Sequence, residues 1–252
     1  MIRGLRAAVR FLTRVPVPGA VTTADDLPRA IGWFPLVGAG VGTAIGGLAV
    51  LALPWWGSGI AAVLAIAVGL LLTGGFHEDA ASDAADGLGG GFTTERVLEI
   101  MRDSRIGAYG AMTLWVVLSL RALLLWRALE ILPGWQVPVA YGLACAWGRW
   151  SAAPLLAWLP SLAEGLAKDI ARRRGWWPLL CASGWAVLAT AGALGLGVAA
   201  SASAAAAGVT ACLVWGWYLW HRLRGQSGDL LGAGNQVVEL TVLLVLLLRP
   251  AW

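Results

Sequence analysis

Charged residues are scarce in this chain. They make up 13% of its 252 residues, whereas 59% are hydrophobic and the mean hydropathy is +0.74. Soluble domains carry roughly 25% charged and about 45–50% apolar residues, and a disordered chain needs low hydrophobicity with high net charge. The composition therefore excludes a water-soluble globular fold and intrinsic disorder. It predicts an all-α fold, a polytopic bundle of transmembrane helices.

Cysteine, histidine and lysine are also rare. The three cysteines lie far apart without a CxxC pair, and there are two histidines, too few for a zinc cluster or a disulfide framework. The net charge of +4 is too small to indicate nucleic-acid binding, because membrane proteins carry such a surplus for topological reasons. Met1–Arg14 holds four arginines and no long apolar run, so we expect no cleavable signal peptide.

Several apolar stretches approach the about 20 residues that a membrane-spanning helix needs. Seven spans are expected, with six or eight as alternatives because some boundaries are soft: Ile31–Leu53, Ile60–Phe76, Ala108–Leu129, Pro138–Leu159, Pro178–Ala200, Ala202–Trp220 and the short Gln236–Leu248. In the first span, Gly38, Gly42 and Gly46 recur every four residues, a spacing that lets another helix approach closely. That helix belongs to the same chain or, in a homo-oligomer, to a second copy; packing within the chain is the favoured interpretation. We expect one integral membrane domain over residues 1–252.

The basic residues predict the orientation. Segments 1–30, 77–107, 160–177 and 221–235 hold 14 of the 18 basic residues, and the alternate connections 54–58 and 130–137 hold none. The positive-inside rule places the arginine-rich segments and the N-terminus in the cytoplasm. Twelve of the 14 acidic residues lie in the same four segments, although acidic residues contribute little to orientation. Chemistry on the cytoplasmic face explains them, and so does the plain need for hydrophilic loops.

An acidic motif stands out in segment 77–107, which we interpret as a cytoplasmic catalytic loop. Asp79, Asp83 and Asp86 follow the spacing i, i+4, i+7, which at about 100° per residue places them within roughly 60° on one helical face. Like charges at this spacing repel one another, so a cation on them would be stabilising. Carboxylates are ligands that Mg²⁺ prefers, with waters and substrate phosphates completing its shell. A solvated acidic loop is the alternative interpretation; the position at the end of a span favours the metal.

The rest of that loop predicts a short amphipathic helix on the cytoplasmic face of the membrane. Thr93 or Thr94 can cap it, and it carries an apolar edge typical of a helix at the membrane surface. Arg102, Asp103 and Arg105 follow it. The two arginines can hold a phosphate or pair with the aspartates; a surface helix that merely connects two spans is equally compatible with the pattern.

Further candidates lie in and near the other spans. Arg149 falls inside the fourth span, where an ionisable residue is costly and points to function, whereas Arg121 fits a helix interface or an internal ion pair. Glu239 lies just inside the last span, after a glycine-punctuated run that contains Asp229 and that we expect to be a flexible loop. His77 stands beside the aspartates, where it can act as a general acid or base or bind phosphate, although a lone histidine is more often structural.

These motifs together resemble the adenosylcobinamide-GDP ribazoletransferase family, the membrane-bound cobalamin synthases, over nearly the whole chain. The motifs that carry the resemblance are Phe11–Pro18 (FLTRVPVP), Phe34–Gly38 (FPLVG), Thr73–Asp79 (TGGFHED) with Asp83 and Asp86, Met101–Gly107 (MRDSRIG), and Ser227–Ala233 (SGDLLGA) with Glu239. Two departures are Ala80-Ala81-Ser82, where something closer to Gly-Leu-Ala is expected, and Ser227, where threonine is usual. Both leave the carboxylates and the hydroxyl in place.

The resemblance implies a Mg²⁺-dependent transferase in a bacterial cytoplasmic membrane, with its active site facing the cytoplasm. It would join adenosylcobinamide-GDP to α-ribazole, or to α-ribazole 5′-phosphate, and release GMP in the last step of nucleotide-loop assembly. The residues would then be catalytic (His77, Asp83), metal-binding (Asp79, Asp83, Asp86) or substrate-binding (Arg102, Asp103, Arg105, Arg149, Asp229, Glu239).

Three other classes of protein compete with this interpretation. A CDP-alcohol phosphatidyltransferase also uses a membrane-surface aspartate cluster with Mg²⁺, but its pattern has glycine and Ala-Arg pieces between the aspartates, and here Ala80 follows Asp79. A membrane transporter fits the glycine-interrupted spans, but it would place ionisable groups near the bilayer midplane rather than in loops. A structural membrane subunit would leave the aspartates unexplained.

Overall fold

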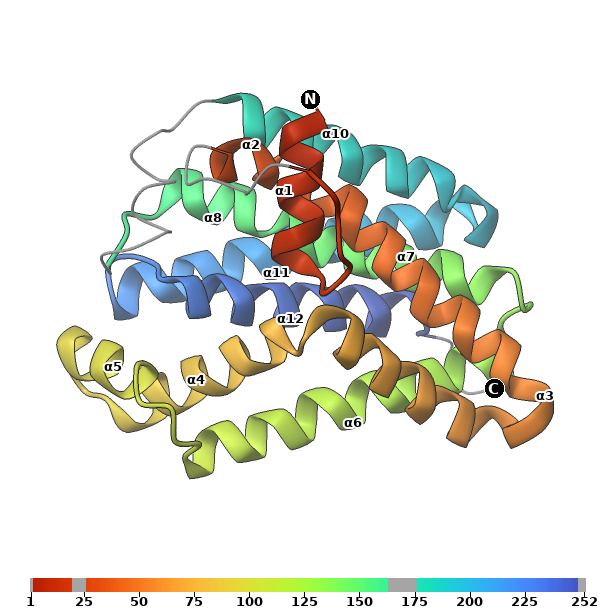
Figure 1. The fold of residues 1–252 in the computed structure, drawn as a ribbon, viewed down its shortest axis with the longest axis horizontal. Coiled ribbons are helices and arrows are strands. Elements are labelled where there is room, and N and C mark those ends of the chain that lie inside the picture. The colour runs from red at the N-terminus through yellow and green to blue at the C-terminus, as the bar shows by residue number, and fades with distance from the viewer. Residues whose placement is uncertain (1, 20–25, 163–175, 249–252) are drawn as a thin grey trace.

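A computed structural model of the chain describes residues 2–19, 26–162 and 176–248 (Figure 1). Their regular elements are helices, and these residues contain no β-strand, as the all-α prediction requires. Parts of the predicted cytoplasmic segments 1–30 and 160–177 lie outside the described residues. The elements are α1 (Ile2–Leu12), α2 (Leu27–Ile31), α3 (Phe34–Thr73), α4 (Phe76–Gly90), α5 (Thr94–Met101), α6 (Ala108–Ile131), α7 (Gln136–Trp150), α8 (Ala152–Trp158), α10 (Trp176–Gly192), η1 (Leu194–Leu196), α11 (Val198–Arg222) and α12 (Gly228–Leu246).

Helix α3 consists of two arms joined by a sharp kink. Gly57 has a positive φ of 70°, a conformation that glycine adopts without steric cost. Pro54, one turn earlier, removes a backbone donor from the helical ladder. The chain therefore turns back within α3, and Figure 1 shows the two arms meeting at one end of the bundle. The first two predicted spans correspond to these arms, and the kink lies at the connection predicted for 54–58.

Four helices of the described chain are long and apolar enough to cross a membrane, namely α3, α6, α11 and α12. The fourth predicted span is divided between α7 and α8 at Ser151, and α10 covers most of the fifth. The chain is therefore a helical membrane protein. The bounds predicted for the last span were wrong, because α12 begins at Gly228 and not at Gln236.

The glycine-punctuated run before Gln236 is helical where a flexible loop was expected. The Ser227 side chain accepts a hydrogen bond from the backbone N–H of Leu230 and so caps α12. A side chain at Gly232 would collide with Ala80 of α4, and one at Gly234 with Trp215 of α11. These glycines therefore allow α12 to pack closely between two neighbours, which stabilises the helix despite their low helical propensity.

The bundle has two distinct ends. In Figure 1 the kink of α3 and the α6–α7 connection lie at one end, while α5 and the α11–α12 connection lie at the other. The first end has the two connections without basic residues, and the second carries residues such as Arg102 and Arg222. Arg102 and Arg222 thus share one end of the bundle, and the orientation of that end in a membrane stays a prediction.

The glycine spacing of the first span serves packing between α3 and α7. A Cβ atom at Gly42 would collide with the carbonyl of Tyr141, and one at Gly46 would lie 2.6 Å from the Cα atom of Pro138. Gly38 contacts α7 in the same way at Cys145. Packing within the chain, the favoured interpretation of this spacing, is confirmed.

Candidate functional site

The acidic motif lies on α4, which begins immediately after the second arm of α3. Two consecutive glycines, Gly74 and Gly75, have positive φ values of 74° and 66°, and they let the chain change direction between the helices. Helix α4 then runs without a break from Phe76 to Gly90. Asp79, Asp83 and Asp86 therefore share one helical face, as their spacing predicted.

The three aspartates differ in exposure, and a fourth carboxylate faces them. Asp79 is exposed, Asp83 is half-buried and Asp86 is buried. The pKa of Asp83 is raised to about 6, first by burial and then by the negative charges of Asp79, Asp229 and Asp86. Asp229 belongs to the first turn of α12, so a second helix contributes to the cluster. Among the residues that the structure describes, no ion pair neutralises Asp79, Asp83 or Asp229.

Asp86 has a partner of its own at the start of α6. Its carboxylate oxygens accept hydrogen bonds from the backbone N–H groups of Gly107 and Gly110, with N···O distances of 2.7 and 2.8 Å. The first turn of a helix has unsatisfied N–H groups and a partial positive charge, so a carboxylate there is stabilising. Asp86 therefore fixes α4 against α6, a role that its spacing alone did not indicate.

The carboxylates of this face are suited to bind Mg²⁺ singly or in pairs, and not as a closed cage. In the described ranges, no group of three or more histidine, cysteine, aspartate or glutamate side chains is close enough to enclose one ion. Mg²⁺ is usually bound by only one or two carboxylates, while waters and substrate phosphates supply the other ligands. Pairs drawn from Asp79, Asp83 and Asp229 match that requirement better than a closed three-carboxylate cage.

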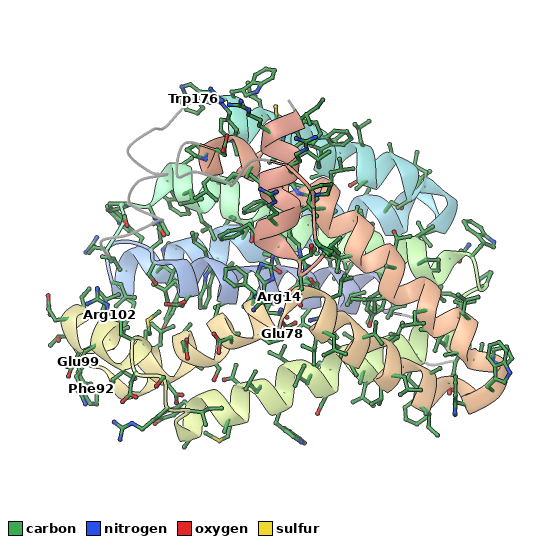
Figure 2. The ribbon with its side chains drawn as sticks, viewed as in Figure 1. Arg14, Glu78, Phe92, Glu99, Arg102 and Trp176 are labelled. Carbon is green, nitrogen blue, oxygen red and sulfur yellow. The ribbon has the colours of Figure 1, made fainter. Side chains whose placement is uncertain are left out.

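Four ionised side chains from four helices form a buried network of ion pairs. Arg121 of α6 pairs with Glu78 of α4 and, at 3.0 Å, with Glu239 of α12. Glu239 also pairs with Arg149 of α7, and all four are nearly inaccessible. Figure 2 shows Glu78 in the interior of the molecule. Buried charges are tolerated only when they are paired and hydrogen-bonded. The buried ion-pair network therefore joins α4, α6, α7 and α12 into one unit.

Sequence reasoning overlooked Glu78 in this network. The available signal was Arg121 itself, because an arginine inside a span requires a buried carboxylate. The internal ion pair considered for Arg121 is confirmed. The amide of Gln236, also overlooked, donates to Glu78 at 3.2 Å. Glu239 contacts the two arginines, and its predicted role in substrate binding stays a prediction.

His77 lies at the start of α4, between the aspartates and the buried ion-pair network. Its side chain is 5% exposed, and Nδ1 has no hydrogen-bond partner within the described part of the molecule. The pKa of His77 is well below its usual value, because burial and then the charges of Arg149 and Arg121 disfavour the imidazolium. The imidazole is therefore neutral near pH 7.

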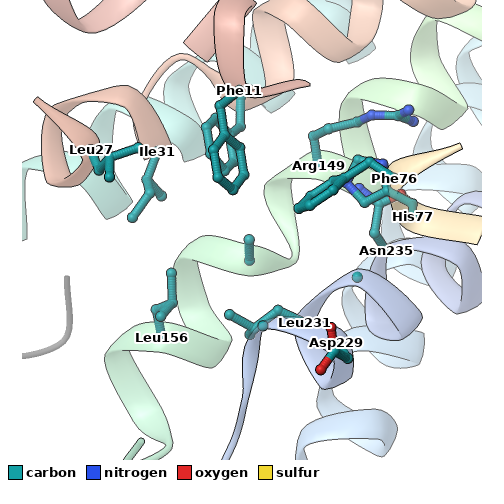
Figure 3. A pocket seen from close by; sticks show the side chains of 14 residues that line it. Phe11, Leu27, Ile31, Phe76, His77, Arg149, Leu156, Asp229, Leu231 and Asn235 are labelled. Atoms are coloured by element: carbon teal, nitrogen blue, oxygen red, sulfur yellow. The ribbon is translucent and has the colours of Figure 1, made fainter. Parts of the chain in front are cut away.

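A cavity of about 220 Å³ lies beside His77. Figure 3 shows His77, Arg149 and Asn235 grouped on one of its sides, with Asp229 near Leu231. Arg149 and Asp229, both predicted to bind substrate, line the same cavity. Its complete lining is Phe11, Leu27, Ile31, Phe34, Phe76, His77, Arg149, Ala152, Leu156, Gly228, Asp229, Leu231, Gly232 and Asn235.

The remaining predicted substrate residues follow α5, whose cap is Thr93, as its sequence allowed. Arg105 is exposed and pairs with Asp103 at 2.6 Å, and hydrogen bonds from Arg105 lower the pKa of Asp103 to about 2. Arg102 is exposed at the same end of the molecule (Figure 2). Within the described residues neither arginine pairs with the aspartates of α4. Asp86, Asp103 and Arg105 line a second, shallow hollow beside α5.

Fold and site together define a helical membrane protein with a cluster of acidic side chains on α4 and α12. The sequence profile of the cobalamin-5-phosphate synthase family matches residues 4–247. The chain belongs to this family and is a transferase of cobalamin biosynthesis.

Individual relatives match over nearly their whole length. An adenosylcobinamide-GDP ribazoletransferase of Leptothrix cholodnii is 41% identical over 244 residues, which cover 94% of this chain and 92% of the relative. Enzymes of the same name are 37% identical in Klebsiella pneumoniae (98% of this chain, 100% of the relative) and 40% identical in Ralstonia nicotianae (99% and 95%). No solved structure matches the chain significantly.

Proposed function

We propose that the protein joins adenosylcobinamide-GDP to α-ribazole, or to α-ribazole 5′-phosphate, in a Mg²⁺-dependent reaction that releases GMP. The names of the relatives support the nucleotide substrate and ribazole as the group that is joined. The observation that carries the chemistry is the meeting of Asp79 and Asp83 of α4 with Asp229 of α12, next to a buried neutral histidine.

The reaction exchanges one phosphorus–oxygen bond for another. A ribose hydroxyl oxygen of the acceptor attacks the phosphorus on the cobinamide side of the diphosphate. The bond between that phosphorus and the bridging oxygen breaks, and GMP leaves with the bridging oxygen. The hydroxyl proton passes to a base of the protein. Mg²⁺, when bound, neutralises the charge that develops on the diphosphate oxygens.

The residues of the chain have separable roles in this proposal. Asp79, Asp83 and the facing Asp229 would hold a cation through one or two of their carboxylates. Asp83, whose pKa is raised to about 6, or the unprotonated nitrogen of the buried His77 ring would accept the hydroxyl proton. Arg149 lines the cavity beside them and would contact phosphate oxygens. Arg102 and Arg105 follow α5, away from this cavity, and would contact phosphate oxygens there. Asp86, held by α6, would orient the aspartate face.

The location of the site supports a reaction at the cytoplasmic surface of a bacterial membrane. Helix α4, which carries the aspartates, runs from the middle of the bundle toward the end where α5, Arg102 and the α11–α12 connection lie (Figures 1 and 2). By the positive-inside rule this end faces the cytoplasm. Segment 77–107, within one membrane domain, would then be the catalytic loop.

The experiment is a GMP-release assay with the purified full chain reconstituted in lipid nanodiscs. We expect release to require both nucleotide substrate and acceptor, to stop when a chelator removes Mg²⁺, and to resume when Mg²⁺ is restored. Asp83→Asn should lower turnover at least about 100-fold, whereas Glu99→Gln, an exposed residue of α5, should not. Unchanged turnover of Asp83→Asn at saturating Mg²⁺, or release indifferent to the chelator, would contradict the proposed role of the aspartates.

A further inference from the structure

The cavity beside His77 has an unusual concentration of aromatic side chains. The chain has four phenylalanines, and three of them, Phe11, Phe34 and Phe76, line this cavity. They come from α1, α3 and α4, so the fold brings them together from distant parts of the sequence. The fourth, Phe92, is 91% exposed. The apolar wall is completed by side chains such as Leu27, Ile31 and Leu156.

The three rings present both faces and edges to one another. Phe11 stacks on Phe34 with ring centroids 5.5 Å apart and an interplanar angle of 10°. Phe76 meets Phe11 edge-on at 5.1 Å and 75°. Such offset-stacked and edge-to-face arrangements are the ones that aromatic rings prefer. A flat aromatic guest can join this set, because it offers the same two kinds of contact.

One side of the cavity is polar. Nδ1 of His77 and Oδ1 of Asn235 are buried, and the described residues offer neither of them a hydrogen-bond partner. A buried polar atom without a partner is costly, so a ligand that bonds to either atom would be stabilised by it. Asp229 also lines the cavity and interacts electrostatically with Asp79 and Asp83. The cavity and the acidic face are therefore adjacent.

We infer that this cavity binds the aromatic base of the acceptor nucleoside, a planar bicyclic benzimidazole attached to ribose. The inference rests on the proposed function, because it assigns a place to one of its two substrates. A base seated among Phe11, Phe34 and Phe76 directs its ribose past Asp229 toward the aspartates of α4. The attacking hydroxyl is then held beside the diphosphate that those aspartates recruit.

The other large groups of the reaction fit this cavity poorly. Pockets for drug-sized ligands measure roughly 300–1,000 Å³, so about 220 Å³ is too small for a corrin macrocycle. Guanine has the right size, but its edge carries several donors and acceptors, and an apolar wall would leave most of them unpaired at high cost. A methyl-substituted benzimidazole has a single free ring nitrogen, which accepts one hydrogen bond and can be satisfied by Nδ1 of His77 in the tautomer that carries a proton there. Oδ1 of Asn235 is an acceptor and would bond to a donor such as a ribose hydroxyl.

The test measures the binding of α-ribazole alone to the full chain in nanodiscs by titration calorimetry. Phe11→Leu removes an aromatic face, and Ala152→Leu fills part of the cavity from α8. Each should weaken binding by about tenfold, equivalent to ~1.4 kcal/mol of lost contact. The matched controls are Phe92→Leu and Ala157→Leu, which change exposed residues and should bind as the unaltered protein does. Ala152→Leu keeps the test decisive if Phe11→Leu unfolds.

Steady-state kinetics then separate this inference from the proposed function. In the GMP-release assay, the cavity variants should raise the KM for α-ribazole about tenfold and leave the KM for adenosylcobinamide-GDP unchanged. Equal effects on both substrates, no effect on either, or unweakened α-ribazole binding would overturn the assignment of the cavity while GMP release still upheld the proposed function. Conversely, an unaltered protein that binds α-ribazole in the cavity but never releases GMP would overturn the proposed function alone.

Discussion

Arg121 and Glu239 form an ion pair in the interior of the bundle, with a guanidinium nitrogen 3.0 Å from a carboxylate oxygen. Glu239 has 0% exposure and also holds Arg149. Neutralising it leaves two buried arginines with one remaining carboxylate, Glu78. Removal of one partner from a buried ion pair typically costs about 3–5 kcal/mol.

Glu239→Gln should therefore lower the stability of the protein by about 3 kcal/mol or more, measured as the thermal or denaturant midpoint in nanodiscs. Glu130→Gln is the matched control, because Glu130 is exposed at the end of α6, and it should change stability by less than about 0.5 kcal/mol. Equal midpoints for the two variants would show that the buried ion-pair network does not stabilise the folded protein.

Close backbone packing between α3 and α7 predicts a second outcome. Gly42→Leu would force a side chain against the carbonyl of Tyr141, and overpacking of this kind costs about 1–3 kcal/mol or more. Gly47→Leu, in the same helix, has no atom within 4 Å of the new Cβ and should be tolerated. The measurement is the yield and thermal midpoint of the folded protein. Equal tolerance of both would argue against the α3–α7 contact.

The hydrogen bonds that Asp86 accepts from the start of α6 lead to a third prediction. A Cβ at Gly110 would collide with Asp86 and lie 2.5 Å from Ser82 Oγ, so Gly110→Ala should displace the carboxylate that fixes α4. Turnover should fall at least about tenfold with a loss of about 1–3 kcal/mol in stability. Gly40→Ala, at a position with open space, is the control for introducing alanine into a helix. Full activity of Gly110→Ala would mean that Asp86 does not need this anchor.

The contribution of α12 to the acidic face leads to a fourth prediction. Asp229→Asn should lower the apparent affinity for Mg²⁺ about tenfold, equivalent to ~1.4 kcal/mol, because one carboxylate that faces Asp79 and Asp83 is neutralised. The measurement is the Mg²⁺ dependence of GMP release at saturating substrates, with Glu99→Gln as the control. A Mg²⁺ curve identical to that of the unaltered protein would separate α12 from the ion site.

Local regularities of the fold could be read from the sequence. Apolar runs located the helices that cross the bundle, the i, i+4, i+7 spacing placed three aspartates on one face, and Thr93 was a candidate cap that the structure confirms. Each of these features depends on residues within a few turns of one another. The start of α12 was misjudged because Gly228 and its neighbours have low helical propensity, and their stabilisation comes from packing against α4 and α11.

Contacts between distant segments could not be read in this way. Glu78 and Arg121 are 43 positions apart, and nothing in their local spacing specifies the pair. Asp229 meets the aspartates of α4 because helices from both halves of the chain converge, and Phe11 meets Phe76 because α1 packs near the start of α4. The cavity and the buried ion pairs are therefore properties of the tertiary fold. The charged residues inside spans indicated that such partners must exist without identifying them.

The order of the four buried ionised residues along the chain has a consequence for biogenesis. Glu78, Arg121 and Arg149 are synthesised first, and together they carry one uncompensated positive charge. Glu239 arrives only with the last helix. Until the ribosome has delivered that helix, the nascent bundle retains an unpaired arginine in a low-dielectric interior. The network of buried ion pairs is therefore complete only once α12 has been made and has packed against α4, α6 and α7.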